Sequence, residues 1–225
     1  MRVLKMKIFQ NILNLFLQSH CPLCQRSTPK ELCPYCTKQI QHCQKQNPAY
    51  LWKQELPVFV WGNYGGAVKR AIAALKYENH PQIGYLLGQW LGESWLLHSP
   101  QPQQQLLVVP IPLHPKKQKQ RGFNQAALIA EGFCNITGCK LKINGLERSK
   151  ETEAQFSLSA VQRQQNLADA FILGKDLRHC PHIPVLLVDD IYTTGATVKA
   201  AVQTLNTHQI QVFGVAAIAT PIKHR

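Results

Sequence analysis

The chain has 225 residues, enough for one sizeable core with a small appended module. Hydrophobic residues make up 45% of it and aromatic residues 8%, as in ordinary globular proteins, which excludes a mostly disordered or mostly membrane-embedded chain. Its 25 Lys and Arg against 12 Asp and Glu give a formal charge of +13, which favours nucleic acid, an acidic membrane surface or phosphorylated small molecules as partners without choosing among them; a solvated basic face is the alternative.

The N-terminal segment, residues 1–19, places apolar side chains near one face at helical spacing, which predicts an amphipathic helix. Lysines, glutamines and asparagines interrupt its apolar run, and no small-residue cleavage site follows, so a signal peptide is not predicted. No segment approaches the roughly 20 apolar residues of a membrane span. We therefore expect a cytoplasmic protein.

Two C-x-x-C pairs follow this segment, and their four thiols are candidate metal ligands: Cys21, Cys24, Cys33 and Cys36. Such pairs can place four sulfurs tetrahedrally around Zn²⁺, and a closed set of four leaves no open position for catalysis. The spacing predicts a small structural zinc finger, with unmetallated thiols as the alternative. We expect residues 1–49 to form this module and residues 50–225 to form the main domain.

From residue 50 onward, apolar runs alternate with amphipathic segments. Strands are predicted at 57–64, 106–112, 140–149, 184–190 and 211–220, and helices at 67–77, 83–97, 122–137 and 194–208. The continuous β-branched and Leu run PVLLVDD indicates a strand buried on both faces. Alternating strands and helices predict an open α/β fold with a mostly parallel sheet, and ligands of such folds bind outside the carboxyl ends of the strands.

The strand over 184–190 ends in two carboxylates, Asp189 and Asp190, and is followed by a tight Thr-Thr-Gly turn and a helix. Backbone N–H groups in such a turn, with a helix N-terminus behind them, form a ready anion site. Gly195 lets the backbone approach a phosphate closely. The neighbouring carboxylates would repel that phosphate unless they serve sugar hydroxyls or a Mg²⁺ ion. The pattern predicts a phosphorylated sugar as ligand.

Competing nucleotide motifs are missing, because neither G-x-x-x-x-G-K-[ST] nor G-x-G-x-x-G occurs. The remaining alternative for the Asp pair is a buried strand whose last residues cap the following helix.

VDDIYTTGAT resembles the motif with which type I phosphoribosyltransferases bind 5-phosphoribosyl-1-pyrophosphate (PRPP), and specifically that of the ComF family of competence-associated proteins. The resemblance extends over nearly the whole chain. It is carried by CPLC…LCPYC, LKYENHPQIGYLLGQWL, VVPIPLHPKKQKQRGFNQAALIA and ETEAQFSLSAVQRQQNLADAF, which stand in the family's order. It implies a type I phosphoribosyltransferase-like fold with an N-terminal zinc finger.

The resemblance also implies roles for individual residues. Asp189 and Asp190 would contact the ribose hydroxyls of Mg²⁺-bound PRPP. The 5-phosphate would be held by Thr193, Thr194, Gly195, Ala196 and Thr197. Pyrophosphate would be bound after the strand over 106–112, often at a cis peptide, by Ile111, Pro112, Leu113, His114, Lys116 and Arg121. For His114, capping of a local turn is the alternative reading.

A loop that closes over the reacting groups is expected within 148–166, with Arg148 and Lys150 as its candidate catalytic cations. The family pattern R-x-R-x-T becomes Arg148-Ser149-Lys150-Glu151-Thr152 here. Lys150 keeps the charge of the second arginine but loses its two-pronged hydrogen bonding.

Three functions remain open from the sequence. The first is a PRPP-dependent phosphoribosyltransferase acting in natural competence and DNA uptake. The second is a non-catalytic competence factor that binds single-stranded DNA and has other competence proteins as partners. The third is a nucleotide-salvage phosphoribosyltransferase.

Overall fold

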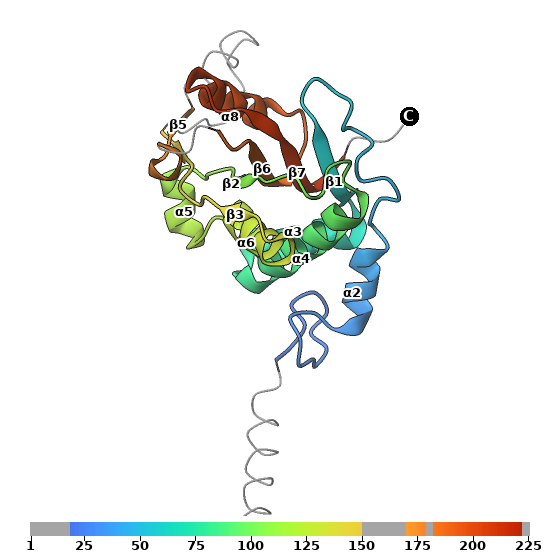
Figure 1. The fold of residues 1–225 in the computed structure, drawn as a ribbon. Coiled ribbons are helices and arrows are strands. Elements are labelled where there is room, and N and C mark those ends of the chain that lie inside the picture. The colour runs from blue at the N-terminus through green and yellow to red at the C-terminus, as the bar shows by residue number, and fades with distance from the viewer. Residues whose placement is uncertain (1–18, 150–169, 179–181, 222–225) are drawn as a thin grey trace, which may run out of the picture.

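A computed structural model describes residues 19–149, 170–178 and 182–221 (Figure 1). Almost all of the predicted N-terminal helix, and most of the loop expected to close over the site, lie outside these residues. The described part contains a five-stranded sheet with helices on both faces. The prediction of an α/β fold is confirmed.

The main sheet contains β1 (Val58–Asn63), β2 (Leu107–Pro110), β3 (Lys140–Leu141), β6 (Val185–Ile191) and β7 (Val212–Thr220). Their spatial order is β1-β7-β6-β2-β3, and every neighbouring pair is parallel. The chain leaves β2 towards β3 but leaves β6 towards β7, so the direction of winding reverses between these two neighbours. Their carboxyl ends therefore form the switch point at which open α/β sheets bind ligands.

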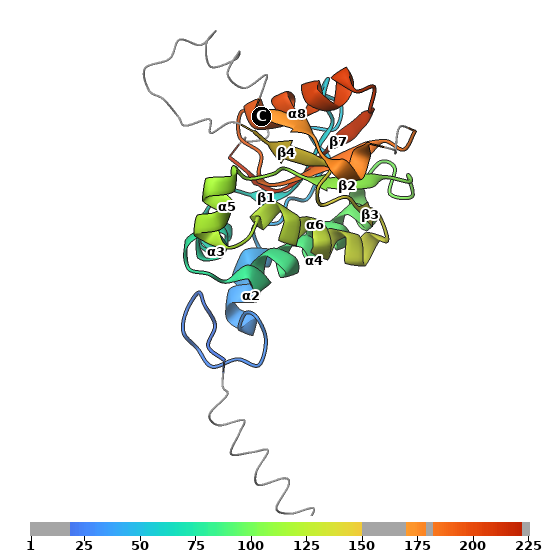
Figure 2. The ribbon, with the colours of Figure 1, turned by 90° about the vertical axis from the view of Figure 1, so that its left-hand side faces the viewer.

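Helices cover the two faces unequally (Figures 1 and 2). One face carries α3 (Gly66–Tyr77), α4 (Pro81–His98) and α6 (Gln125–Thr137). The other carries α8 (Ala196–Thr207) and a two-stranded antiparallel sheet of β4 (Leu146–Arg148) and β5 (Phe171–Leu173), which a short 3₁₀ turn (Lys175–Leu177) follows.

The core is divided by the sheet, because successive side chains of a strand point to opposite faces. Leu186 and Val188 pack with α3, α4 and α6, whereas Val185 and Leu187 pack with α8. All four are fully buried, as expected for a central parallel strand. Glycines let α4 and α6 approach closely: a Cβ on Gly88 would lie 2.1 Å from the carbonyl oxygen of Ile129.

Two local predictions differ from the structure. Residues 140–149 were expected to form one strand, but β3 joins the main sheet and β4 pairs with β5, because a turn at Asn144–Gly145 redirects the chain. Helix α5 (Pro115–Arg121) was not predicted, because none of its residues is buried and it has no apolar face. It is fixed by its ends: His114 caps it and Gly122, with φ of 84°, terminates it.

The cysteine-rich segment continues into α2 (Pro34–Gln41), and its following residues pair with the edge of β1. Asn63 N donates to the Cys43 oxygen at 3.0 Å, and Lys45 N donates to the Trp61 oxygen at 2.9 Å. The division at residues 49 and 50 stays a prediction. Within the described ranges, no helix combines the length and the apolar character that crossing a membrane requires.

Candidate functional site

The two adjacent carboxylates near the end of β6 point to opposite faces of the sheet. Asp190 continues the Leu186–Val188 series and is 4% exposed, on the side of α3 and α6. Asp189 is partly buried on the side of α8 and β4. Its Oδ1 also accepts a hydrogen bond of 2.8 Å from the Asp190 N–H. The structure therefore gives the two residues of the predicted pair different surroundings.

Asp190 is bound by two side chains that sequence reasoning did not identify. Lys76, in the last turn of α3, forms an ion pair with it, and Gln125 Nε2, at the start of α6, donates to its Oδ1 at 3.1 Å. Arg121 in turn donates to Gln125 Oε1. The two contacts of Asp190 join residues distant in sequence, whereas Arg121 and Gln125 are only four residues apart. For Lys76, the local signal was its place directly after the buried Ala74–Leu75 pair in α3.

The surroundings of Asp189 disfavour the ionised form of its carboxyl group. Burial, and secondarily the neighbouring Asp190, raise the pKa of Asp189 well above its usual value. Burial lowers the pKa of Arg148, and the attraction of Asp189 acts in the opposite direction. The Arg148 guanidinium also lies 5.5 Å from the centre of the Phe171 ring. The structure thus brings Arg148 near Asp189, whereas Lys150 lies outside the described residues.

The predicted phosphate turn leads directly into the N-terminus of α8. Gly195 has φ of 76° immediately before α8, and a Cβ there would lie 2.7 Å from the Tyr192 hydroxyl. The first N–H groups of a helix have no partner inside it, and the helix dipole makes this end positive. Thr194 Oγ1 accepts from Ala196 N at 3.4 Å, and the neighbouring Thr193 is exposed.

The loop after β2 lies beside this turn because β2 and β6 are paired. Ile111 N donates to the Val188 oxygen at 2.9 Å, and Asn124 Nδ2 donates to the Ile111 oxygen at 3.0 Å. The described residues contain no cis peptide bond, so the cis peptide expected in this loop is not observed. His114 Nδ1 accepts from Lys116 N at 3.3 Å and caps α5, which matches its alternative reading.

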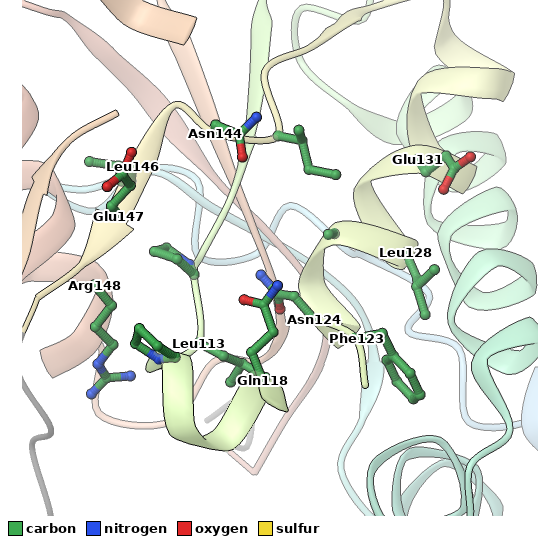
Figure 3. Close-up of a pocket in the computed structure, with 14 residues that line it drawn as sticks. Leu113, Gln118, Phe123, Asn124, Leu128, Glu131, Asn144, Leu146, Glu147 and Arg148 are labelled. Carbon is green, nitrogen blue, oxygen red and sulfur yellow. The ribbon is translucent and has the colours of Figure 1, made fainter. Parts of the chain in front are cut away.

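Three of the six residues predicted to bind pyrophosphate line one or the other of two described cavities. Pro112 and Leu113 line a cavity of about 380 Å³, in which Gln118 and Asn124 lie side by side, with Arg148 at its edge (Figure 3). Arg121 instead lines a cavity of about 640 Å³ that begins at Lys76. Neither of these two cavities is lined by all six predicted residues.

The four cysteines of the finger do come together. Their Sγ atoms all lie within 4.8 Å of one another, and Cys24 and Cys33 are 3.5 Å apart. A tetrahedral zinc ion with bonds of about 2.3 Å separates its sulfurs by about 3.8 Å, so the cluster fits such an ion. The N–H of Cys36 lowers the pKa of Cys33 to about 6, while burial raises the pKa of Cys36. The cluster can hold a metal such as zinc with no position left for a substrate.

Comparison with known proteins gives relatives over most of the chain, although no family model matches it. Competence protein F of Haemophilus influenzae is 29% identical over 209 residues, covering 87% of this chain and 89% of that protein. DNA utilization protein YhgH of Escherichia coli is 29% identical over 199 residues, covering 82% and 83%. Competence protein ComFC of Bacillus subtilis is 26% identical over 188 residues, covering 82% and 70%. These matches, each over 82% or more of the chain, support its assignment to the ComF family.

Proposed function

We propose that the protein acts in competence and DNA uptake as a PRPP-binding phosphoribosyltransferase-like protein. The names of its relatives, competence protein F and DNA utilization protein, support the first part. The junction between β6 and α8 supports the second. There a carboxylate, Asp189, stands directly before a glycine-containing turn and a helix N-terminus.

The shape of PRPP matches this order of groups. Its 5-phosphate would accept from the N–H groups and hydroxyls of residues 193–197, and its ribose hydroxyls would donate to Asp189. Asp190, already bound by Lys76 and Gln125, would hold the floor of the site and reach the ribose at its edge. Mg²⁺ would be held by Asp189 and the ligand oxygens, and it would offset the repulsion between carboxylate and phosphate.

The proposed chemistry is pentosyl transfer. The bond from the anomeric carbon to pyrophosphate breaks, a bond from that carbon to the acceptor forms, and pyrophosphate leaves with the bonding electrons. Arg148 near Asp189, with Lys150 two residues later in the sequence, would stabilise charge as it develops on the leaving group. No separate nucleophile on the protein is required.

A calorimetric titration of Mg²⁺-PRPP into the zinc-loaded full chain tests the binding site. We expect binding that requires Mg²⁺ and that weakens about tenfold or more in Asp189→Asn, as for loss of a charged hydrogen-bond acceptor. Glu55→Gln, at an exposed carboxylate in the segment before β1, is the matched control and should bind as wild type does. Equal affinity in wild type and Asp189→Asn would reject the assignment.

A second candidate is a single-strand binding protein without catalysis, favoured by the finger. Arg26 lies 4.7 Å from the ring centre of Tyr35, which is 59% exposed, so a cation and a flat apolar surface are presented together. DNA affinity should then fall steeply with salt and drop in Arg26→Gln/Lys30→Gln. Binding that ignores both salt and this double variant would remove the candidate.

A further inference from the structure

A basic cavity between the end of α3 and α5 is separate from the turn assigned to the 5-phosphate. Its volume is about 640 Å³. Four of the described residues that line it are cations, and none is a carboxylate. The cations are Lys76, Lys117, Lys119 and Arg121; Tyr77, Asn79, Gln120 and Gly122 complete the lining. Lys76 is paired with Asp190, and the other three cations give the lining an excess of positive charge, which attracts phosphate groups.

Helix α5 supplies this charge without contributing to the core. None of its seven residues is buried, so its order comes from the His114 cap and the Gly122 terminus rather than from packing. In the part of the chain that the structure describes, neither Lys117 nor Lys119 forms an ion pair. Their charges are therefore available to a ligand in the cavity.

Tyr77 gives the cavity a second, independent feature. It is the last residue of α3, and 78% of it is exposed, the largest exposed fraction among the described large hydrophobic side chains. The guanidinium of Arg121 lies 5.8 Å from the centre of its ring. An exposed ring bordered by cations can stack a flat heterocycle while the cations hold an attached phosphate.

From these two features we propose that the cavity binds a nucleotide unit, with its base stacked on Tyr77 and its phosphate held by Lys117, Lys119 and Arg121. The cavity meets the proposed sugar-phosphate site at Lys76, whose ammonium group is paired with Asp190. The proposal goes beyond PRPP binding and does not depend on it. Pyrophosphate alone would need the cations but gains nothing from an aromatic ring.

The test is fluorescence anisotropy of a labelled oligothymidylate, about ten nucleotides long, with the zinc-loaded full chain. Stacking of one base on an aromatic ring is lost in Tyr77→Ala, so affinity should fall about tenfold, whereas Tyr77→Phe should retain it. Because Tyr77 is so exposed, neither change should disturb folding. Leu97→Ala removes a similarly exposed apolar side chain outside the cavity and should leave the affinity unchanged, while Tyr35→Ala measures the separate contribution of the finger.

A charge variant tests the phosphate part of the proposal. Lys117→Gln/Lys119→Gln should reduce the slope of log affinity against log salt by about 1.4, or about 0.7 for each phosphate contact on a single strand. Lys53→Gln/Lys175→Gln removes the same charge from exposed positions outside the cavity and should leave the slope unchanged.

Competition experiments distinguish a free nucleotide from a nucleic acid strand, and both from inorganic pyrophosphate. If thymidine monophosphate displaces the oligonucleotide from wild type but not from Tyr77→Ala, the ligand is a free nucleotide. If the monophosphate does not displace the oligonucleotide, although Tyr77→Ala still weakens oligonucleotide binding, the ligand is a nucleic acid strand. The proposal is overturned if Tyr77→Ala binds the oligonucleotide as wild type does, if Tyr35→Ala accounts for the loss instead, or if only inorganic pyrophosphate binds. A failed PRPP titration leaves each of these outcomes readable, because none of them uses PRPP.

Discussion

Lys76, at the end of α3, forms a largely buried ion pair with Asp190, near the end of β6. Gln125, the first residue of α6, donates to the same carboxylate. One acidic side chain therefore ties two helices to the central strand at the switch point of the sheet. This arrangement holds α3 and α6 against β6 beside the candidate site.

Removing the lysine should be costly for folding. In Lys76→Met the Asp190 carboxylate keeps its burial but loses its cation, and such a loss destabilises a protein by about 3–5 kcal/mol. Urea denaturation should show this fall in the free energy of unfolding. Lys69→Met, at an exposed position of the same helix, should change it by less than about 0.5 kcal/mol. Equal effects of the two changes would mean that the ion pair contributes no stability.

The second prediction concerns the turn before α8. Gly195→Ala places a side chain at φ of 76° and against the Tyr192 hydroxyl, so it should cost more than the 1–2 kcal/mol, roughly, of a left-handed backbone alone. Gly138→Ala is the matched control, with φ of 73° and open space around the new Cβ. Thermal unfolding should rank Gly195→Ala below Gly138→Ala, and only the former should lose Mg²⁺-PRPP binding. The same PRPP affinity in both would exclude close contact at Gly195.

The third prediction is a dependence of stability on pH. Because the folded protein holds the Asp189 proton more tightly than the unfolded chain does, this residue's contribution to stability is lost as pH rises above its ordinary pKa of 3.8 towards its raised folded-state value. Asp189→Asn should therefore gain stability relative to wild type as pH rises towards neutrality without ligand. Urea titrations at several pH values measure the difference; a difference that stays constant with pH would show that Asp189 has an ordinary pKa.

The fourth prediction concerns the metal. Elemental analysis should find about one zinc per chain, as four thiolates require, and Cys33→Ser should lose most of it together with thermal stability. Cys43→Ser is the matched control, since Cys43 is nearby but lies outside the cluster. A stable wild-type protein without metal, or zinc loss in the Cys43 variant alone, would contradict the assignment.

The strands and helices could be predicted from the sequence where a local pattern of apolar residues determines them. β6 and β7 are continuous apolar runs, and α3, α6 and α8 have an apolar face, so their sequences determine their type. Helix α5 has no such face, and β4 and β5 are three residues each, too short for periodicity to distinguish them. The pairing of β4 with β5 is a long-range contact, which local sequence patterns do not predict.

The candidate site shows the same division. The Asp189–Thr197 segment could be recognised because its residues are consecutive and the motif lies across one strand-to-helix junction. The contacts of Asp190 could not, because Lys76 and Gln125 come from other helices and meet only after the sheet has formed. The cysteine cluster was predictable because two short repeats confine four thiols.

Amide hydrogen exchange with and without Mg²⁺-PRPP tests the central claim most directly, because it locates the ligand on the chain. The account predicts slower exchange at the amides of residues 193–197 in wild type, and no such change in Asp189→Asn. Binding that leaves these amides unchanged in wild type, or protects only other segments, would contradict the assignment of the β6–α8 junction as the PRPP site.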